Sequence, residues 1–169
     1  MNQSADMPSG NGMPVGGTFV PADFEVPDGF IKGKFRLVPL GPEHNERDYR
    51  AWTTSMEHIR RTPGFEKYSW PTSMTIDENM GDLVQHAADF RTRAGFTYSV
   101  MSEDDDVIGC VYIYPAGRPG HAVVRSWVRK DYAHLDAPLY HVIDTWLRRT
   151  WPFAGFSYAP RSKQYEFAN

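Results

Sequence analysis

Several residues that could take part in chemistry lie between His121 and His141. His121 opens an apolar run, and an imidazole can accept a proton near neutral pH, so it is a candidate general base; the alternative is a turn histidine that faces water. His134, Asp136 and His141 could suggest a metal cluster. However, the first would lie in a loop and the last on the outer face of a helix, so we expect no metal site.

Basic side chains surround Trp127 in the same segment. Arg125, Arg129 and Lys130 could hold phosphate groups, or they could belong to a solvated strand end, and the sequence leaves both alternatives open. The chain has one cysteine, Cys110, in an apolar run. We interpret it as a small buried residue and not as a nucleophile, because nothing near it in sequence would lower the pKa of its thiol.

Composition excludes several classes of protein. The 169 residues carry a formal net charge of -3, which does not favour nucleic acid or an anionic membrane surface. No run approaches the ~18 apolar residues of a membrane-spanning helix, and the segment from Met1 to Gly17 does not resemble a signal peptide. A single cysteine allows no internal disulfide, so we expect a cytoplasmic protein without membrane or nucleic-acid partners.

The elements that must position these residues can be predicted from periodicity. Residues 107–114 and 121–129 are rich in β-branched and aromatic residues and predict two strands, joined by a Pro/Gly turn at 115–120. Asp136 can cap a helix over 137–149. Its apolar positions form one stripe at helical spacing: Leu139, Val142, Ile143, Trp146 and Leu147.

Two helices are predicted upstream. The first begins at Pro42 and ends at 60–64, with Tyr49, Trp52, Met56 and Ile59 on one apolar face. The second follows the capping-box pattern from Thr75 to Glu78, runs to about Arg93 and stops at Gly95. Its expected inward residues are Met80, Leu83, Val84, Ala87 and Ala94.

Three further strands complete the predicted sheet, at 34–40, 96–100 and 153–159. The acidic run 103–106 is expected to be a hairpin turn and not a cation site. The predicted class is α+β: a mixed twisted sheet, made of an antiparallel meander and a strand after a crossover helix, with helices on its faces. We expect a disordered or loosely packed arm over 1–23, pinned in part by Phe19, Phe24 and Phe30, one domain over 24–160, and a tail over 161–169.

This order of elements resembles the GNAT superfamily of acyl-CoA N-acyltransferases over residues 33–159. The resemblance is carried by Val107-Ile108-Gly109, by Trp127-Val128-Arg129, and by Leu139 and Trp146-Leu147. It implies acetyl-CoA as cofactor and an amine of a small molecule or protein as acceptor. It also implies that the main chain of Trp127, Val128 and Arg129 pairs with pantetheine, and that His121 lies near the place of the family's catalytic base.

The chain departs from the family pattern at the phosphate loop. The family has a glycine-rich loop at a helix start, where glycines let the backbone approach a diphosphate. Here residues 132–138 contain no glycine, and they include Asp136 and Pro138. Three readings stay open: an active N-acetyltransferase, a non-catalytic GNAT-fold binding or assembly module that has lost CoA binding, and an enzyme with other chemistry. The family's usual acceptor elements after 153–159 are also missing, and a homodimer could supply them.

Overall fold

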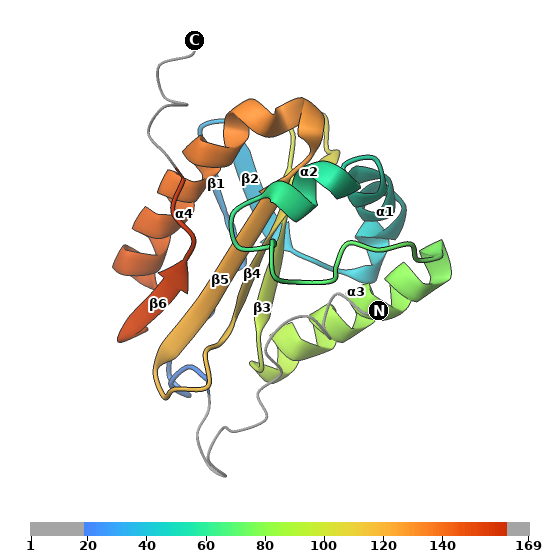
Figure 1. The fold of residues 1–169 in the computed structure, drawn as a ribbon. Coiled ribbons are helices and arrows are strands. Elements are labelled where there is room, and N and C mark those ends of the chain that lie inside the picture. Colours follow the sequence, from blue (N-terminus) through green and yellow to red (C-terminus); the bar gives the residue numbers. More distant parts are fainter. Residues whose placement is uncertain (1–18, 162–169) are drawn as a thin grey trace.

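A six-stranded mixed sheet forms the centre of the computed structural model, which describes residues 19–161 (Figure 1). The strands lie in chain order, and all neighbours are antiparallel except the parallel pair β5 and β6. Their bounds are Phe30–Lys32 (β1), Phe35–Pro39 (β2), Phe96–Met101 (β3), Val107–Pro115 (β4), His121–Val128 (β5) and Gly155–Tyr158 (β6). The predicted α+β class, meander and parallel final strand are confirmed.

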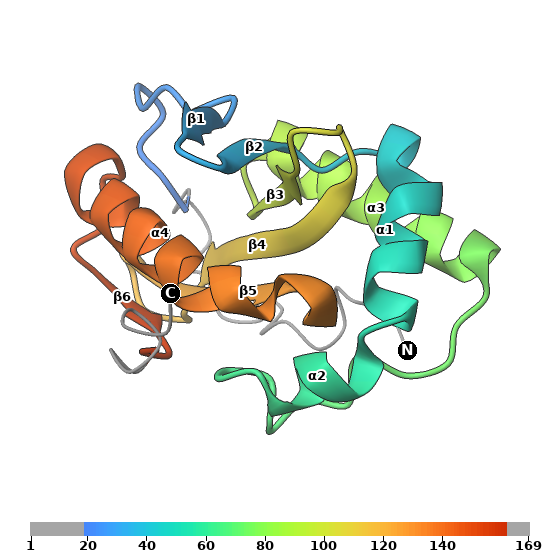
Figure 2. The ribbon, with the colours of Figure 1, turned by 90° about the horizontal axis from the view of Figure 1, so that it is seen from above.

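Helices cover both faces of the sheet. Helix α4 (Asp136–Thr150) lies on one face, and α1 (Asn45–Thr53), α2 (Met56–Arg61) and α3 (Ile76–Thr92) lie on the other (Figure 2). Short 3-10 helices precede two of them, η1 (Pro42–His44) before α1 and η2 (Lys130–Leu135) before α4. The sheet is therefore the middle of three layers.

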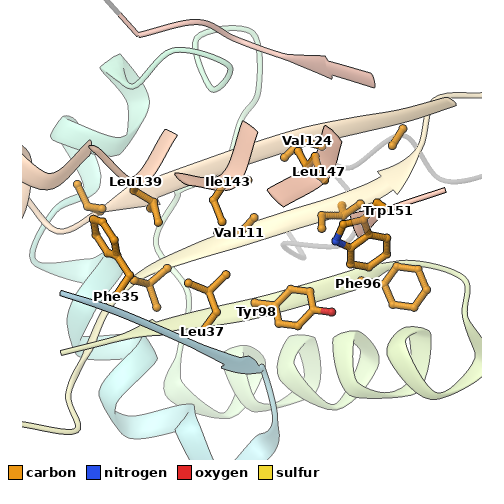
Figure 3. Packing of buried hydrophobic residues seen from close by; sticks show 14 of the residues in the cluster. Phe35, Leu37, Phe96, Tyr98, Val111, Val124, Leu139, Ile143, Leu147 and Trp151 are labelled. Atoms are coloured by element: carbon orange, nitrogen blue, oxygen red, sulfur yellow. The ribbon is translucent and has the colours of Figure 1, made fainter. Parts of the chain in front are cut away.

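The core beneath α4 is made of the predicted apolar stripe. Leu139, Ile143 and Leu147 are at most 1% exposed and face the sheet, where Val111 and Val124 pack against them (Figure 3). Apolar side chains at helical spacing thus meet apolar side chains that alternate along the strands.

The layer on the opposite face has polar contacts in its interior. Asn79 of α3 is fully buried; its Oδ1 accepts a hydrogen bond from Trp52 Nε1 at 3.0 Å. Its Nδ2 donates to Asn45 Oδ1 at 2.9 Å and to Asp48 Oδ2 at 3.0 Å. Hydrogen bonds between α1 and α3 therefore help to stabilise this layer, as apolar burial does under α4.

The predicted continuous helix after Pro42 is wrong, because the structure divides it into η1, α1 and α2. The break follows Thr53, and Ser55 has φ −129° and ψ 17°, outside the helical region. The Ser55 hydroxyl accepts a hydrogen bond from the Lys130 main-chain N–H at 3.0 Å. A contact to a segment far away in sequence thus favours the break, and helical periodicity could not reveal it.

Part of the predicted inner face of α3 is also wrong. Met80 and Val84 are 37% and 50% exposed, and Ala94 is exposed beyond the helix end. The capping box of Thr75 and Glu78 is present as predicted, with the Thr75 hydroxyl accepting from the Glu78 N–H. The helix ends at Thr92, and its C-cap is Arg93, with a left-handed φ of 64°, and not Gly95. Polar residues occupy inward positions of α3, so a prediction based on hydrophobicity assigned the wrong side chains to the core.

The beginning of the described chain belongs to the core. Phe19 and Val20 are buried, Phe24 packs on Trp151, and Phe30 packs on Trp146, so the expected pinning aromatics are confirmed. Phe30 begins β1, a strand that the sequence analysis missed. The predictions for 1–18 and for 162–169 lie outside the described residues, and the domain boundaries stay predictions. Within residues 19–161, no helix combines the length and apolar character needed to cross a bilayer.

Candidate active site

The most distinctive feature of the sheet is the end of β5, where it continues past its parallel partner. The register of β5 and β6 runs from His121 opposite Gly155 to Val124 opposite Tyr158. Beyond Val124, β5 remains paired with β4 as far as Val128, opposite Gly109. One edge of β5 therefore departs from β6 over its last residues.

Strand alternation decides which main-chain groups face that edge. The Arg129 N–H donates to the Ile108 carbonyl at 2.8 Å, so Arg129 points toward β4, and Trp127 shares that direction. Ser126 and Val128 point the other way, toward the departing strand. Of the three residues that the GNAT resemblance implied for pantetheine, only Val128 presents its main chain there, and Ser126 joins it.

The loop before α4 is wound into η2 and uses its amides internally. The Tyr132 N–H donates to the Arg129 carbonyl at 2.9 Å, and the Asp136 N–H donates to the Ala133 carbonyl. The Lys130 N–H donates to the Ser55 hydroxyl. These three amides therefore have hydrogen-bond partners within the protein.

The prediction that Asp136 caps α4 is wrong. Leu135 occupies the N-cap position without a side-chain hydrogen bond, and Asp136 is the first helical residue. The Asp136 carboxylate instead accepts a hydrogen bond from Arg161 Nε at 2.8 Å. A favourable ion pair to a residue 25 positions later along the chain replaces the local cap.

Three neighbouring clefts surround this end of the sheet. The first, about 480 Å³ in volume, lies between α2 and the start of α4. The second, about 490 Å³, shares His58 and Arg61 with the first and is bounded by Lys130. The third, about 530 Å³, lies over the β5–β6 junction and shares Pro160 with the first. The first cleft is also lined by Ala133, Asp136, Pro160 and Arg161. The second is also lined by Ser55, Glu57 and Lys130. The third is lined by Tyr68, Val123, Arg125, Phe156 and Tyr158, among others.

Basic groups dominate the first two clefts. His58 Nε2 is a buried atom without a hydrogen-bond partner, and it belongs to a residue that lines both clefts. Arg61 is exposed and pairs with Glu57 at 2.5 Å, while Lys130 is exposed. The donor set of histidine, arginine and lysine is suited to phosphate oxygens.

The third cleft is aromatic and has a buried cation on its wall. The Arg125 guanidinium lies 3.8 Å from the centroid of the Tyr68 ring and 4.8 Å from that of Phe65. Arg125 is only 5% exposed, so it is not part of a solvated strand end. At the junction with β6, the hydroxyls of Tyr158 and Ser126 lie 2.5 Å apart, and burial raises the pKa of Tyr158.

Arg129 is committed to ion pairs within the protein. Its guanidinium contacts Asp106 at 2.9 Å and Asp131 at 2.7 Å. Burial acts to lower its pKa, but hydrogen bonds with the two carboxylates prevail and raise it. Asp106 also pairs with Arg50, which explains the acidic turn as a partner for arginines and not as a cation site.

His121 lies at the opposite end of β5 from Val128. Seven strand positions separate them, which corresponds to about 23 Å. His121 Nδ1 is 3.0 Å from the Pro119 carbonyl, and a carbonyl can only accept, so Nδ1 carries the proton. In the neutral ring Nε2 is then the basic nitrogen. The structure fixes a tautomer that suits a base, but it does not bring His121 to the open edge.

Cys110 and the histidines of 134–141 do not form a site of their own. Cys110 is fully buried, and burial raises the pKa of its thiol, which confirms the interpretation as a core residue. Among residues 19–161, no three His, Cys, Asp or Glu side chains are grouped so that they could hold a metal ion. The His134 ring is stacked against Tyr132 instead.

Sequence reasoning missed three residues of this site: His58, Tyr158 and Arg161. His58 lies on the α2 segment that was assigned to a continuous helix, and Arg161 lies in the predicted tail. The signal for Arg161 was weak because a single arginine near the chain end resembles any solvated residue. Only the β5–β6 pairing, which carries the chain back to Ser126, makes its position apparent.

Structural comparison identifies the fold. The chain superposes on ribosomal-protein-S5-alanine acetyltransferase from Vibrio fischeri with a TM-score of 0.56 and 13% identity, over 73% of this chain and 67% of that one. It superposes on the microcin C7 self-immunity acetyltransferase MccE, solved with acetyl-CoA and AMP, with a TM-score of 0.56 and 11% identity, over 73% and 66%. For the ribosomal L7/L12 acetyltransferase RimL in complex with coenzyme A, the values are 0.57 and 10%, over 71% and 67%.

These similarities show that the chain has the GNAT acetyltransferase fold, and they confirm the predicted resemblance at the level of fold. The chain spans about two thirds of the length of these structures. No protein-family model and no curated protein sequence matches it.

Proposed function

We propose that this chain is an acyl-CoA-dependent N-acyltransferase that acetylates an amine of a small molecule or a protein. One observation carries the proposal: β5 continues past β6, so that the main-chain groups of Ser126 and Val128 are directed away from β4, along the edge that β6 does not cover. Main-chain groups at such a strand edge can pair with the amides of pantetheine. The likeness of fold to acetyltransferases supports the same assignment.

The groups around the clefts that could bind the phosphates of acetyl-CoA are side chains and not main-chain amides. The amides of Lys130, Tyr132 and Asp136 already donate to groups of the protein, so we do not assign the phosphates to these main-chain groups. Side chains can take this role, because His58 has a buried Nε2 without a partner and shares its clefts with Arg61 and Lys130. We therefore assign the phosphates to these side chains.

When bound, acetyl-CoA supplies a thioester carbonyl that an amine can attack. As the amide bond forms, the C–S bond breaks and the CoA thiolate that leaves takes up a proton from water. The amine must in turn give a proton to a base. His121 is the candidate, because its Nδ1 proton is held by the Pro119 carbonyl and Nε2 stays basic. It lies about 10 Å before Val124, where β5 leaves β6, and about 23 Å before Val128, so several water molecules would have to relay the proton.

Thermal shift with acetyl-CoA tests the proposal directly. A ligand at about 100 times its Kd stabilises the folded state by about 2.7 kcal/mol, which raises Tm measurably. No shift at millimolar acetyl-CoA would reject the proposed function. Once an amine acceptor gives turnover, His121→Gln should lower kcat by at least about 100-fold and remove the acidic limb of the pH profile, in which kcat rises with pH as a general base loses its proton, whereas His134→Gln should not.

A second candidate is a GNAT-fold binding or assembly module without catalysis. The internal use of the η2 amides and the Asp136 carboxylate at the start of α4 favour it, since both disfavour a diphosphate at that helix end. The absence of an acetyl-CoA shift, together with a dimer in light scattering, would support this candidate over the enzyme.

A further inference from the structure

The chain itself occupies the open edge of β5. The segment Ala159–Arg161 follows β6, and the Arg161 side chain reaches back to β5. Arg161 Nη2 donates to the Ser126 carbonyl at 2.9 Å, Nε donates to Asp136 Oδ2 at 2.8 Å, and Nη1 donates to the Ala159 carbonyl at 2.8 Å. The side chain is only 3% exposed, so it is a packed part of the site.

Arg161 occupies a position at which a ligand would bind to β5. The Ser126 carbonyl is one of the main-chain groups that face the departing strand, and a pantetheine amide would donate to it. Arg161 already makes that hydrogen bond. The same guanidinium also links β5 to the first residue of α4, and thereby bridges the two elements between which a cofactor would enter.

The clefts lie on the two sides of this segment. Pro160 lines both the cleft at the start of α4 and the cleft over the β5–β6 junction, and Arg161 lines the former. A ligand that reaches from the basic clefts to the aromatic cleft along β5 would therefore pass beside Pro160 and Arg161.

We infer that Arg161 is a gate that holds the site closed, and that binding of CoA displaces it from Ser126 and Asp136. This inference rests on the proposed function. A closed form lowers the apparent affinity by the fraction of molecules in which the gate is open. Weakening the gate should therefore strengthen binding, although the arginine is a cation beside the path of an anionic ligand.

This opposite sign makes the inference testable. If Arg161 only attracted phosphate, Arg161→Gln would weaken CoA binding, because a positive charge is removed. If Arg161 is a gate, the same variant should bind CoA more tightly, by about tenfold or more, since charge-assisted hydrogen bonds no longer compete. Isothermal titration calorimetry with CoA measures this without any acceptor or turnover.

Two further variants complete the experiment. Arg148→Gln removes an exposed arginine of α4 that pairs with Asp144, and it should leave the Kd for CoA unchanged. Arg161→Lys keeps the charge but lacks the planar guanidinium that reaches Ser126, Ala159 and Asp136 at once, so it should also bind more tightly; it serves if Arg161→Gln does not fold. Circular dichroism verifies folding of each protein.

The outcomes separate the two proposals. Tighter binding in the Arg161 variants supports both the gate and the acyltransferase. Binding by the unaltered protein that becomes weaker or stays equal in the variants overturns the gate and leaves the function standing. No CoA binding by any of the folded proteins rejects the proposed function.

Discussion

Asn79→Ala is the sharpest test of the polar packing between α1 and α3. The side chain is fully buried and makes hydrogen bonds to Trp52, Asn45 and Asp48. Its removal leaves the Trp52 N–H without an acceptor and takes a donor from the Asp48 carboxylate. Each buried polar group that loses its partner costs about 1–3 kcal/mol, and the two together should cost about 3–4 kcal/mol of unfolding free energy.

Urea unfolding followed by tryptophan fluorescence measures this cost. With an m value of about 2 kcal/mol/M, the midpoint should fall by about 1.5–2 M while m stays constant. Gln85→Ala, an exposed change on the same helix, should stay within about 0.5 kcal/mol. In a double-mutant cycle with Trp52→Phe, we expect a coupling of about 1 kcal/mol or more. A loss below about 1 kcal/mol for Asn79→Ala, or strict additivity with Trp52→Phe, would refute the argument.

Three further predictions concern stability. Gly95→Ala places a Cβ 2.3 Å from Cε1 of Tyr114 and should lower the unfolding free energy by about 1–3 kcal/mol. Gly81→Ala on α3 places its Cβ in open space and should raise the unfolding free energy by about 0.5–1 kcal/mol. Thermal melts that rank the two variants in the opposite order would contradict this. Thr75→Ala removes the capping hydroxyl and should cost about 1 kcal/mol in urea unfolding, and no change would count against the cap. Burial lowers the pKa of His86 to about 4 from the ordinary 6.5. As the pH falls below 6.5, the unfolded chain therefore takes up a proton before the folded chain does. The unfolding free energy should fall by about 3 kcal/mol between pH 6.5 and 4. In His86→Gln that part of the pH dependence should disappear, and an unchanged slope in pH-dependent melts would show that another group is responsible.

Periodicity predicted most of the fold because the relevant segments have one dominant signal. The strands β3 to β5 are continuous β-branched and aromatic runs, and α4 has a single apolar stripe, so local pattern and final burial agree. The errors occur where distant groups decide. Ser55 breaks a helix because it accepts a hydrogen bond from Lys130, and the inner face of α3 contains Asn79, which a hydrophobic count assigns to solvent.

The candidate site was less accessible to sequence reasoning for the same physical reason. Val128 was found through its strand, but the direction of each main-chain group depends on the register with β4, which no single segment encodes. Asp136 was interpreted through the local rule for helix caps, and its true partner, Arg161, comes from the far side of a crossover. Sequence patterns within single segments therefore indicated where the site lies, but the pairing of β5 with β6 was needed to identify the residues that form it.

The parallel pairing of β5 with β6 also sets the order in which this sheet can open. It spans only four residue pairs, and β6 has a strand on one side only in the described sheet, whereas β4 is held on both sides by long antiparallel neighbours. The meander closes short loops, but β6 must wait for α4 to dock. We expect main-chain amides of β6 to exchange with deuterated water well before those of β4, so that local opening of β6 uncovers the edge of β5 from His121 to Val124 while β4 stays paired.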